Sequence, residues 1–246
     1  GVPGCGKSEI AKAAGATLTL IREEFQAQQI RFEAIVDTLA GAIIKRLSEG
    51  RRDGLAVIAE GLVLGLDPEF LGSLPEIERD AHGNVRISEV KIGDLLKAAV
   101  QERLKKLDID MTIVAKDIGY ELRCADPIPF DLEYTRDLGY CATKYLLSGG
   151  NAAMISMQAG NFVPVPFREL LDPATGRARI RLVDIRSTRY AIARRYMIRL
   201  RRDDFDNPIK LAKIASTAGM PVTQFRKEFE YLIATELPPL IFGVET

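Results

Sequence analysis

Two side chains with the chemistry of an anion site stand three positions apart near the middle of the chain, Tyr120 and Arg123. A guanidinium group matches a phosphate with two parallel hydrogen bonds, and a phenol can donate another beside it. The apolar run at 111–115 before them predicts a buried strand, and a helical pattern begins near Asp131. Open α/β sheets bind ligands at such strand-to-helix crossings. The alternative is that Arg123 pairs with Asp126 or Asp131, and residue chemistry alone favours neither interpretation.

Glu60 is a second candidate binding residue. It follows the apolar run at 55–59, which predicts a short buried strand, and so it lies at the carboxyl end of that strand. A carboxylate in this position accepts hydrogen bonds from the hydroxyl groups of a sugar. The alternative is an acidic side chain that caps a helix or forms a salt bridge in a loop.

The first eight residues match the pattern of a phosphate-binding loop. In such a loop the backbone amides around Gly6 cradle phosphate groups, Lys7 reaches the terminal phosphates and Ser8 holds Mg²⁺. The pattern requires a buried strand before the loop, and no strand precedes Gly1 in this sequence. We therefore favour a glycine-rich start of a helix that runs to about residue 14, with a nucleotide-binding loop as the alternative.

The hydrophobic periodicity predicts the elements that position these residues. The β-branched runs at 17–21 and 55–59 predict strands, and the pattern at 32–50 predicts an amphipathic helix between them. Such a strand–helix–strand unit builds a parallel sheet, so we predict an α/β fold. The other predicted elements are an irregular segment at 67–88, a strand at 152–157, and helices at 92–107, from about 131 to a stop at 148–150, at 186–201, at 208–217 and at 221–234. Prolines exclude 163–167 from the centre of a sheet.

Charged clusters elsewhere are expected to be solvated. The adjacent carboxylates Glu23 and Glu24 follow the strand predicted at 17–21, and a solvated strand end is favoured over a catalytic pair. The basic runs at 177–181 and 194–202 are interpreted as an exposed strand and an exposed helix face. We infer no net basic domain from these runs, because acidic residues elsewhere in the chain balance them.

The overall composition excludes several classes of function. Lys and Arg together number 34, as do Asp and Glu, and this balance argues against a general nucleic-acid or anionic-membrane surface. No apolar run approaches the roughly 20 residues of a membrane span. His82 is the single histidine, which argues against a catalytic triad or a histidine-rich metal site. Cys5, Cys124 and Cys141 lack metal-type spacing, and an odd number of cysteines is typical of a reduced, cytoplasmic protein.

The segment around Tyr120 and Arg123 also carries a resemblance to a known family. Residues 119–123 followed by 126–131 resemble the sugar-phosphate-binding segment of the phosphofructokinases, most closely the pyrophosphate-dependent branch. The resemblance covers most of residues 10–235, and its further motifs occur in the family's order at 15–21, 134, 138–139, 149–150, 154–158, 181–184 and 196–200. The sequence departs from the family where Gly1 replaces the arginine of a Met-Gly-Arg signature, Arg22 replaces a proline and Asn161 replaces a histidine.

This resemblance implies a phosphofructokinase-like parallel sheet flanked by helices, with C-terminal packing helices. It implies a substrate-binding domain at 1–160 and a C-terminal part at 161–246 that returns to the donor domain. The implied reaction transfers a phosphoryl group from pyrophosphate or ATP to the 1-hydroxyl of fructose 6-phosphate. Tyr120 and Arg123 would hold the 6-phosphate and Glu60 the sugar hydroxyls. The catalytic base and most of the donor and Mg²⁺ site are expected upstream of residue 1, so the isolated chain is expected to be nearly inactive. The family also implies a homo-oligomer.

Two hypotheses from other classes remain open at this stage. One is a nucleotide-hydrolysing protein that uses Gly6, Lys7 and Ser8. The other is a non-catalytic module that binds sugar phosphates or contributes to a subunit interface. The sequence leaves the choice between pyrophosphate and ATP open.

Overall fold

The computed structural model describes residues 17–25, 29–74, 90–118, 124–158, 160–173, 176, 182–234 and 236. The chain divides into two compact units, one formed by Gly1–Lys116 and Leu182–Thr246 and the other by Asp117–Arg181. The predicted boundary after residue 160 falls inside the second unit, and the predicted division of the chain into domains stays a prediction. No helix in the described part of the chain is long and apolar enough to span a membrane.

The first unit begins with the predicted strand–helix–strand motif. Strand β1 (Leu18–Leu20) leads through the short helix η1 (Arg22–Glu24) to α2 (Phe32–Ser48), which is followed by β2 (Ala56–Ile58). The two strands are parallel, with Thr19 opposite Val57, so this part of the prediction is confirmed. Arg46 closes the turn after α2 by an ion pair with Asp53 at 2.8 Å.

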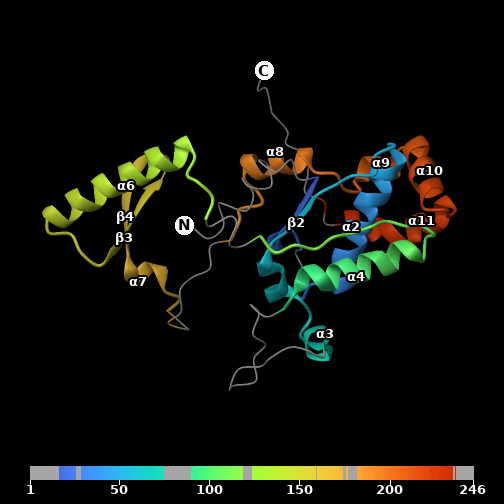
Figure 1. Cartoon of the computed structure of the whole chain (residues 1–246), viewed down its shortest axis with the longest axis horizontal. Coiled ribbons are helices and arrows are strands. Elements are labelled where there is room, and N and C mark those ends of the chain that lie inside the picture. The colour runs from blue at the N-terminus through green and yellow to red at the C-terminus, as the bar shows by residue number, and fades with distance from the viewer. Residues whose placement is uncertain are drawn as a thin grey trace. The chain divides into compact units, whose positions relative to one another are not determined.

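Helices complete the first unit after β2. They are η2 (Glu60–Gly65), α3 (Pro68–Ser73), α4 (Ile92–Lys105), α8 (Thr188–Tyr196), α9 (Arg202–Asp206), α10 (Pro208–Thr217), α11 (Val222–Phe229) and η4 (Glu230–Ile233). The core contains the fully buried rings of Phe205, Phe225 and Phe229. It lies among α2, α4, α10 and α11, which Figure 1 shows side by side.

Three predictions for this unit are wrong. Residues 109–118 form no strand; instead Ile109, Met111 and Ile113 alternate against the core with no sheet partner. The helix expected at 186–201 ends at Tyr196, after which the backbone runs extended beside β1 and Ile198 N–H donates to the carbonyl of Thr17 at 2.8 Å. Part of the segment expected to be irregular at 67–88 is helix α3, and residues 75–88 of that segment lie outside the described residues.

The second unit contains a helix and a hairpin. Helix α6 (Pro129–Leu147) precedes strands β3 (Ala153–Gln158) and β4 (Asn161–Pro166), which pair antiparallel, and the short helix α7 (Phe167–Leu170) follows. The two prolines of β4 therefore lie in a two-stranded sheet that has no central strand, as their lack of N–H donors requires. Ser156 is the one buried residue in the described part of this unit, so its elements share almost no core of their own.

The described elements thus mix helices with one parallel and one antiparallel pair of strands, which is compatible with an α/β fold. The larger parallel sheet implied by the family resemblance stays an expectation.

Candidate functional site

Glu60 lies where the sequence placed it, just beyond the carboxyl end of β2. Ala59 extends the strand pairing, because its N–H donates to the carbonyl of Leu20 at 2.9 Å, and Glu60 then begins η2. Since β1 and β2 are parallel, η1 and η2 follow them at the same edge of the sheet. The Glu60 side chain is exposed, and no hydrogen bond or ion pair joins its carboxylate to another described residue. It is therefore available to accept hydrogen bonds from a ligand at this edge.

The other predicted site residues fall outside the described residues. Tyr120 and Arg123 belong to the 119–123 gap, and Gly6, Lys7 and Ser8 belong to the first sixteen residues. Their proximity to Glu60 in one site stays a prediction, and so does the role of each residue. The basic run at 177–181 lies outside the described residues as well.

A buried ionic network that the sequence analysis missed lies at the same edge. The expectation of a solvated strand end is wrong for Glu24, which is only 7% exposed. The guanidinium of Arg199 donates from Nη2 to both carboxylate oxygens of Glu24, at 3.1 and 3.2 Å. The Nη1 of Arg194 lies 3.4 Å from the same carboxylate, and the hydroxyl of Tyr190 donates to it. Arg199 is itself 7% exposed, so the expectation of an exposed basic face is also wrong at this residue.

Tyr190 connects this network to the strand ends. Its ring packs with Ile21 and Ala59, the residues that directly follow β1 and β2. Burial, and then the negative charge of Glu24, raise the pKa of the Tyr190 phenol above its usual range. The phenol consequently keeps its proton and remains a donor to Glu24. Next to Glu24, Glu23 accepts a hydrogen bond from the N–H of Val183 at 2.8 Å, which ties η1 to the segment before α8.

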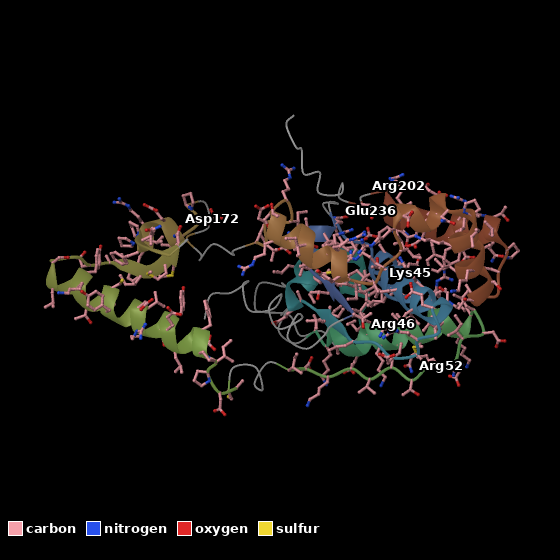
Figure 2. All side chains as sticks on the ribbon, turned by 90° about the horizontal axis from the view of Figure 1, so that it is seen from above. Lys45, Arg46, Arg52, Asp172, Arg202 and Glu236 are labelled. Carbon is pink, nitrogen blue, oxygen red and sulfur yellow. The ribbon has the colours of Figure 1, made fainter. Side chains whose placement is uncertain are left out.

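A cavity of about 240 Å³ opens beside the network. Its polar lining includes Glu24, Arg31, Arg194, Arg199 and Glu236, so groups of both charges face it. Glu236 is held by the backbone N–H of Arg202 at 2.7 Å, and Figure 2 shows these two residues close together. The cavity has the polarity to hold a small charged group beside η1, which follows β1 at this edge of the sheet.

The described residues do not supply a metal site. No group of three or more histidine, cysteine, aspartate or glutamate side chains in the described ranges could hold a metal ion. The expected Mg²⁺ therefore has no set of ligands among these residues.

The sequence carries a partial signal for this network. Tyr190 and Arg194 are four residues apart, which places both on one face of a helix. Arg199 is flanked by Ile198 and Leu200, a pattern typical of a segment that runs through the interior. The partner, Glu24, is far away in the sequence, so neither pattern identifies it.

Comparison with known proteins finds several relatives that are named for the same enzyme. The chain is 43% identical over 234 residues to a pyrophosphate--fructose 6-phosphate 1-phosphotransferase of Thermotoga maritima, a match that covers 93% of this chain and 55% of the relative. It is 41% identical over 233 residues to the protein of the same name from Naegleria fowleri, covering 91% of this chain and 53% of the relative. The chain belongs to the phosphofructokinase family.

The family resemblance and its pyrophosphate-dependent branch are thus confirmed. A more distant relative, the beta subunit of the corresponding Ricinus communis enzyme, is 26% identical over 203 residues, covering 64% of this chain and 36% of the relative. No family model matches the chain. This phosphofructokinase homologue spans about half the length of the curated relatives with which it shares more than 40% identity.

Proposed function

We propose that this chain carries the sugar-phosphate-binding part of an enzyme that transfers a phosphoryl group from pyrophosphate to the 1-hydroxyl of fructose 6-phosphate. The observation that carries the proposal is the match of nearly the whole chain to two proteins named for this reaction, at 43% and 41% identity. The same names favour pyrophosphate over ATP as the phosphoryl donor.

The proposed roles follow from the chemistry of the residues. Glu60 accepts hydrogen bonds from sugar hydroxyls, and this role is supported by its exposed carboxylate at a strand end, which has no partner among the described residues. Arg123 binds the 6-phosphate through two parallel hydrogen bonds, with Tyr120 donating beside it. The buried network of Glu24, Tyr190 and Arg199 fixes η1 and the end of β1, and so keeps this edge of the sheet rigid.

Phosphoryl transfer depends mainly on positioning and on neutralising charge, and Mg²⁺ supplies much of that neutralisation when it is bound. We propose that the catalytic base and the Mg²⁺ ligands belong to the part of the enzyme that this chain does not span. The soluble, oligomeric state expected of the family is part of the same proposal.

Calorimetric titration with fructose 6-phosphate and, separately, with fructose tests the proposal. We expect fructose 6-phosphate to bind and fructose to give no measurable heat, because the phosphate supplies the charged contacts. Equal signals from the two sugars would contradict a phosphate-binding site. A signal from magnesium-ATP with none from fructose 6-phosphate would instead favour the nucleotide-binding alternative based on Lys7.

A further inference from the structure

The cavity of about 240 Å³ beside the buried network carries an excess of one positive charge. Three arginines, Arg31, Arg194 and Arg199, and two acids, Glu24 and Glu236, line it. Sites for drug-sized molecules occupy roughly 300–1,000 Å³, so this cavity suits a smaller ligand. Much of the remaining wall is apolar and consists of Phe25, Ile30, Ala34, Leu200 and Leu232.

The cavity is distinct from the place proposed for the sugar hydroxyls. Glu60 is not among the residues that line it. A ligand bound in this cavity would therefore be additional to the sugar phosphate of the proposed function.

Both acids of the cavity already have donors within the protein. Glu24 accepts hydrogen bonds from Arg199 Nη2 and from the hydroxyl of Tyr190. Glu236 accepts the backbone N–H of Arg202 at 2.7 Å. The acids are thus satisfied, and the charge that is left uncompensated in the cavity wall is positive.

Two of the arginines have donors to spare. Arg31 is exposed and has no hydrogen-bond or ion-pair partner among the described residues, while its guanidinium lies 5.7 Å from the centre of the Tyr231 ring. The side chain of Arg194 contacts Glu24 only through Nη1, at 3.4 Å. Because a guanidinium carries five N–H donors, both arginines can bind an anion without giving up these contacts.

Two further features of the wall would be stabilised by an anion. Arg199 is 7% exposed, and its Nε is buried without a hydrogen-bond partner among the described residues, which is a costly state for a donor. Helix α2 begins at Phe32 beside the cavity, and no described side chain caps it. The free N–H groups at the start of a helix attract anions. Glu33, the acid in the first turn of α2, does not line the cavity.

We propose that this cavity binds a small monocarboxylate. The carboxylate lies against Arg31, Arg194 and the N-terminus of α2, since a guanidinium donates two parallel hydrogen bonds to a carboxylate. The uncharged part of the ligand lies against Ile30, Ala34 and Leu232.

The charge of the wall decides between a monocarboxylate and a phosphate. One negative charge matches the one positive charge in excess. A dianionic phosphate would bring a second negative charge toward Glu24 and Glu236 with no further cation in excess to balance it. It would also leave the apolar wall uncovered.

The test is a calorimetric titration of the unaltered chain with benzoate, benzyl alcohol and inorganic phosphate at constant ionic strength. Benzyl alcohol has the ring of benzoate without its charge, and phosphate has charge without a ring. We expect benzoate to bind most tightly, with the affinities of the other two probes at least about tenfold lower.

Two variants locate the binding. Arg31→Gln should weaken benzoate binding roughly tenfold, the effect of losing one charge-assisted contact. Ala34→Met should abolish it, because the longer side chain fills the cavity and methionine is well tolerated in a helix. The control is Arg52→Gln, since Arg52 is exposed and does not line the cavity.

Several results would overturn the proposal. They are absence of benzoate binding, equal affinities for benzoate and benzyl alcohol, tighter binding of phosphate than of benzoate, and unchanged benzoate binding in Ala34→Met. Equal weakening by Arg31→Gln and Arg52→Gln would do the same, because it would reveal a general charge effect. The fructose 6-phosphate titration tests the proposed function independently, so failure of one proposal is distinguishable from failure of the other.

Discussion

Arg199 and Glu24 are separated by 175 positions in the sequence, yet they form a buried ion pair in which one guanidinium nitrogen reaches both carboxylate oxygens. The same nitrogen donates to the carbonyl of Thr19 at 3.1 Å, inside β1. The pair thus fastens the extended segment after α8 to the strand that ends at the proposed ligand edge. Removal of either partner would leave the other charge buried and poorly compensated.

We predict that Arg199→Met lowers the free energy of unfolding by about 3–5 kcal/mol, the usual cost of leaving a buried charge without its partner. The double variant Arg199→Met, Glu24→Met should lose less unfolding free energy than the sum of the losses in the two single variants, since it buries neither charge of the pair. Urea denaturation measures both quantities. Asp53→Ala, which removes the exposed ion pair with Arg46, is the control and should leave the midpoint almost unchanged. Additive losses in the double variant would show that Glu24 and Arg199 are not coupled.

Tyr190 makes the free energy of unfolding depend on pH in the alkaline range. Its pKa is raised in the folded state, first by burial and then by Glu24, whereas a tyrosine in the unfolded chain titrates near 10. The folded state therefore retains a proton that the unfolded state loses, and the resulting stability is fully present below about pH 10 and is lost as the pH rises toward the folded pKa.

Tyr190→Phe should accordingly show a smaller drop in unfolding free energy between about pH 8 and pH 11 than the unaltered chain. Tyr196→Phe is the matched control, because Tyr196 is 80% exposed and should leave the alkaline drop unchanged. Denaturant titrations at the two pH values provide the measurement. An identical drop in all three proteins would mean that Tyr190 does not contribute.

Arg103 joins three helices of the first unit. From α4 its Nε donates to Asp37 on α2 at 2.9 Å, and its Nη2 donates to Glu228 on α11 at 2.7 Å. The guanidinium also lies 5.0 Å from the centre of the Phe229 ring. Arg103→Lys should reduce the unfolding free energy by about 1–3 kcal/mol, because an ammonium cannot reproduce the planar fork. The control is Glu102→Gln, which removes only the exposed ion pair between Glu102 and Lys106 and should have no measurable effect on the unfolding free energy. A denaturation midpoint for Arg103→Lys equal to that of the control would contradict the prediction.

Local sequence signals accounted for several elements of the fold. Helix α10 matches its prediction at 208–217 because Asn207 caps its first N–H groups, at 3.0 and 3.2 Å, and Pro208 occupies its first position. Residues 197–201 contain neither glycine nor proline, so nothing local marked the end of α8. That end depends on Arg201, whose guanidinium binds the last carbonyls of the helix, and on the pairing of Ile198 with Thr17.

The features of the site that the sequence did not reveal depend on contacts between residues that are far apart in the sequence. Glu60 was placed correctly, since a strand end can be recognised from its own residues. The burial of Glu24 depends on Arg199, Arg194 and Tyr190, and a pair of adjacent carboxylates carries no information about them. The strand expected at 111–115 failed for a similar reason, because alternating apolar residues indicate a buried face but do not supply a neighbouring strand.

The purified chain should bind its substrate without converting it. If the catalytic base and the Mg²⁺ ligands belong to the other part of the enzyme, incubation with fructose 6-phosphate, pyrophosphate and Mg²⁺ should yield almost no fructose 1,6-bisphosphate. A coupled assay for that product provides the measurement, with a full-length relative such as the Thermotoga maritima enzyme as the positive control. Turnover at a rate comparable with the control would contradict this division of roles.

The most direct test of the central claim is the affinity for fructose 6-phosphate of the unaltered chain and of its Arg123→Ala and Glu60→Gln variants. We expect Arg123→Ala to abolish measurable binding, since it removes the phosphate contact, and Glu60→Gln to weaken it roughly tenfold. The controls are Arg136→Ala and Glu69→Gln, which alter exposed residues on α6 and α3 and should bind as tightly as the unaltered chain. If the chain binds fructose 6-phosphate equally well with and without Arg123, the sugar-phosphate site is not where we place it.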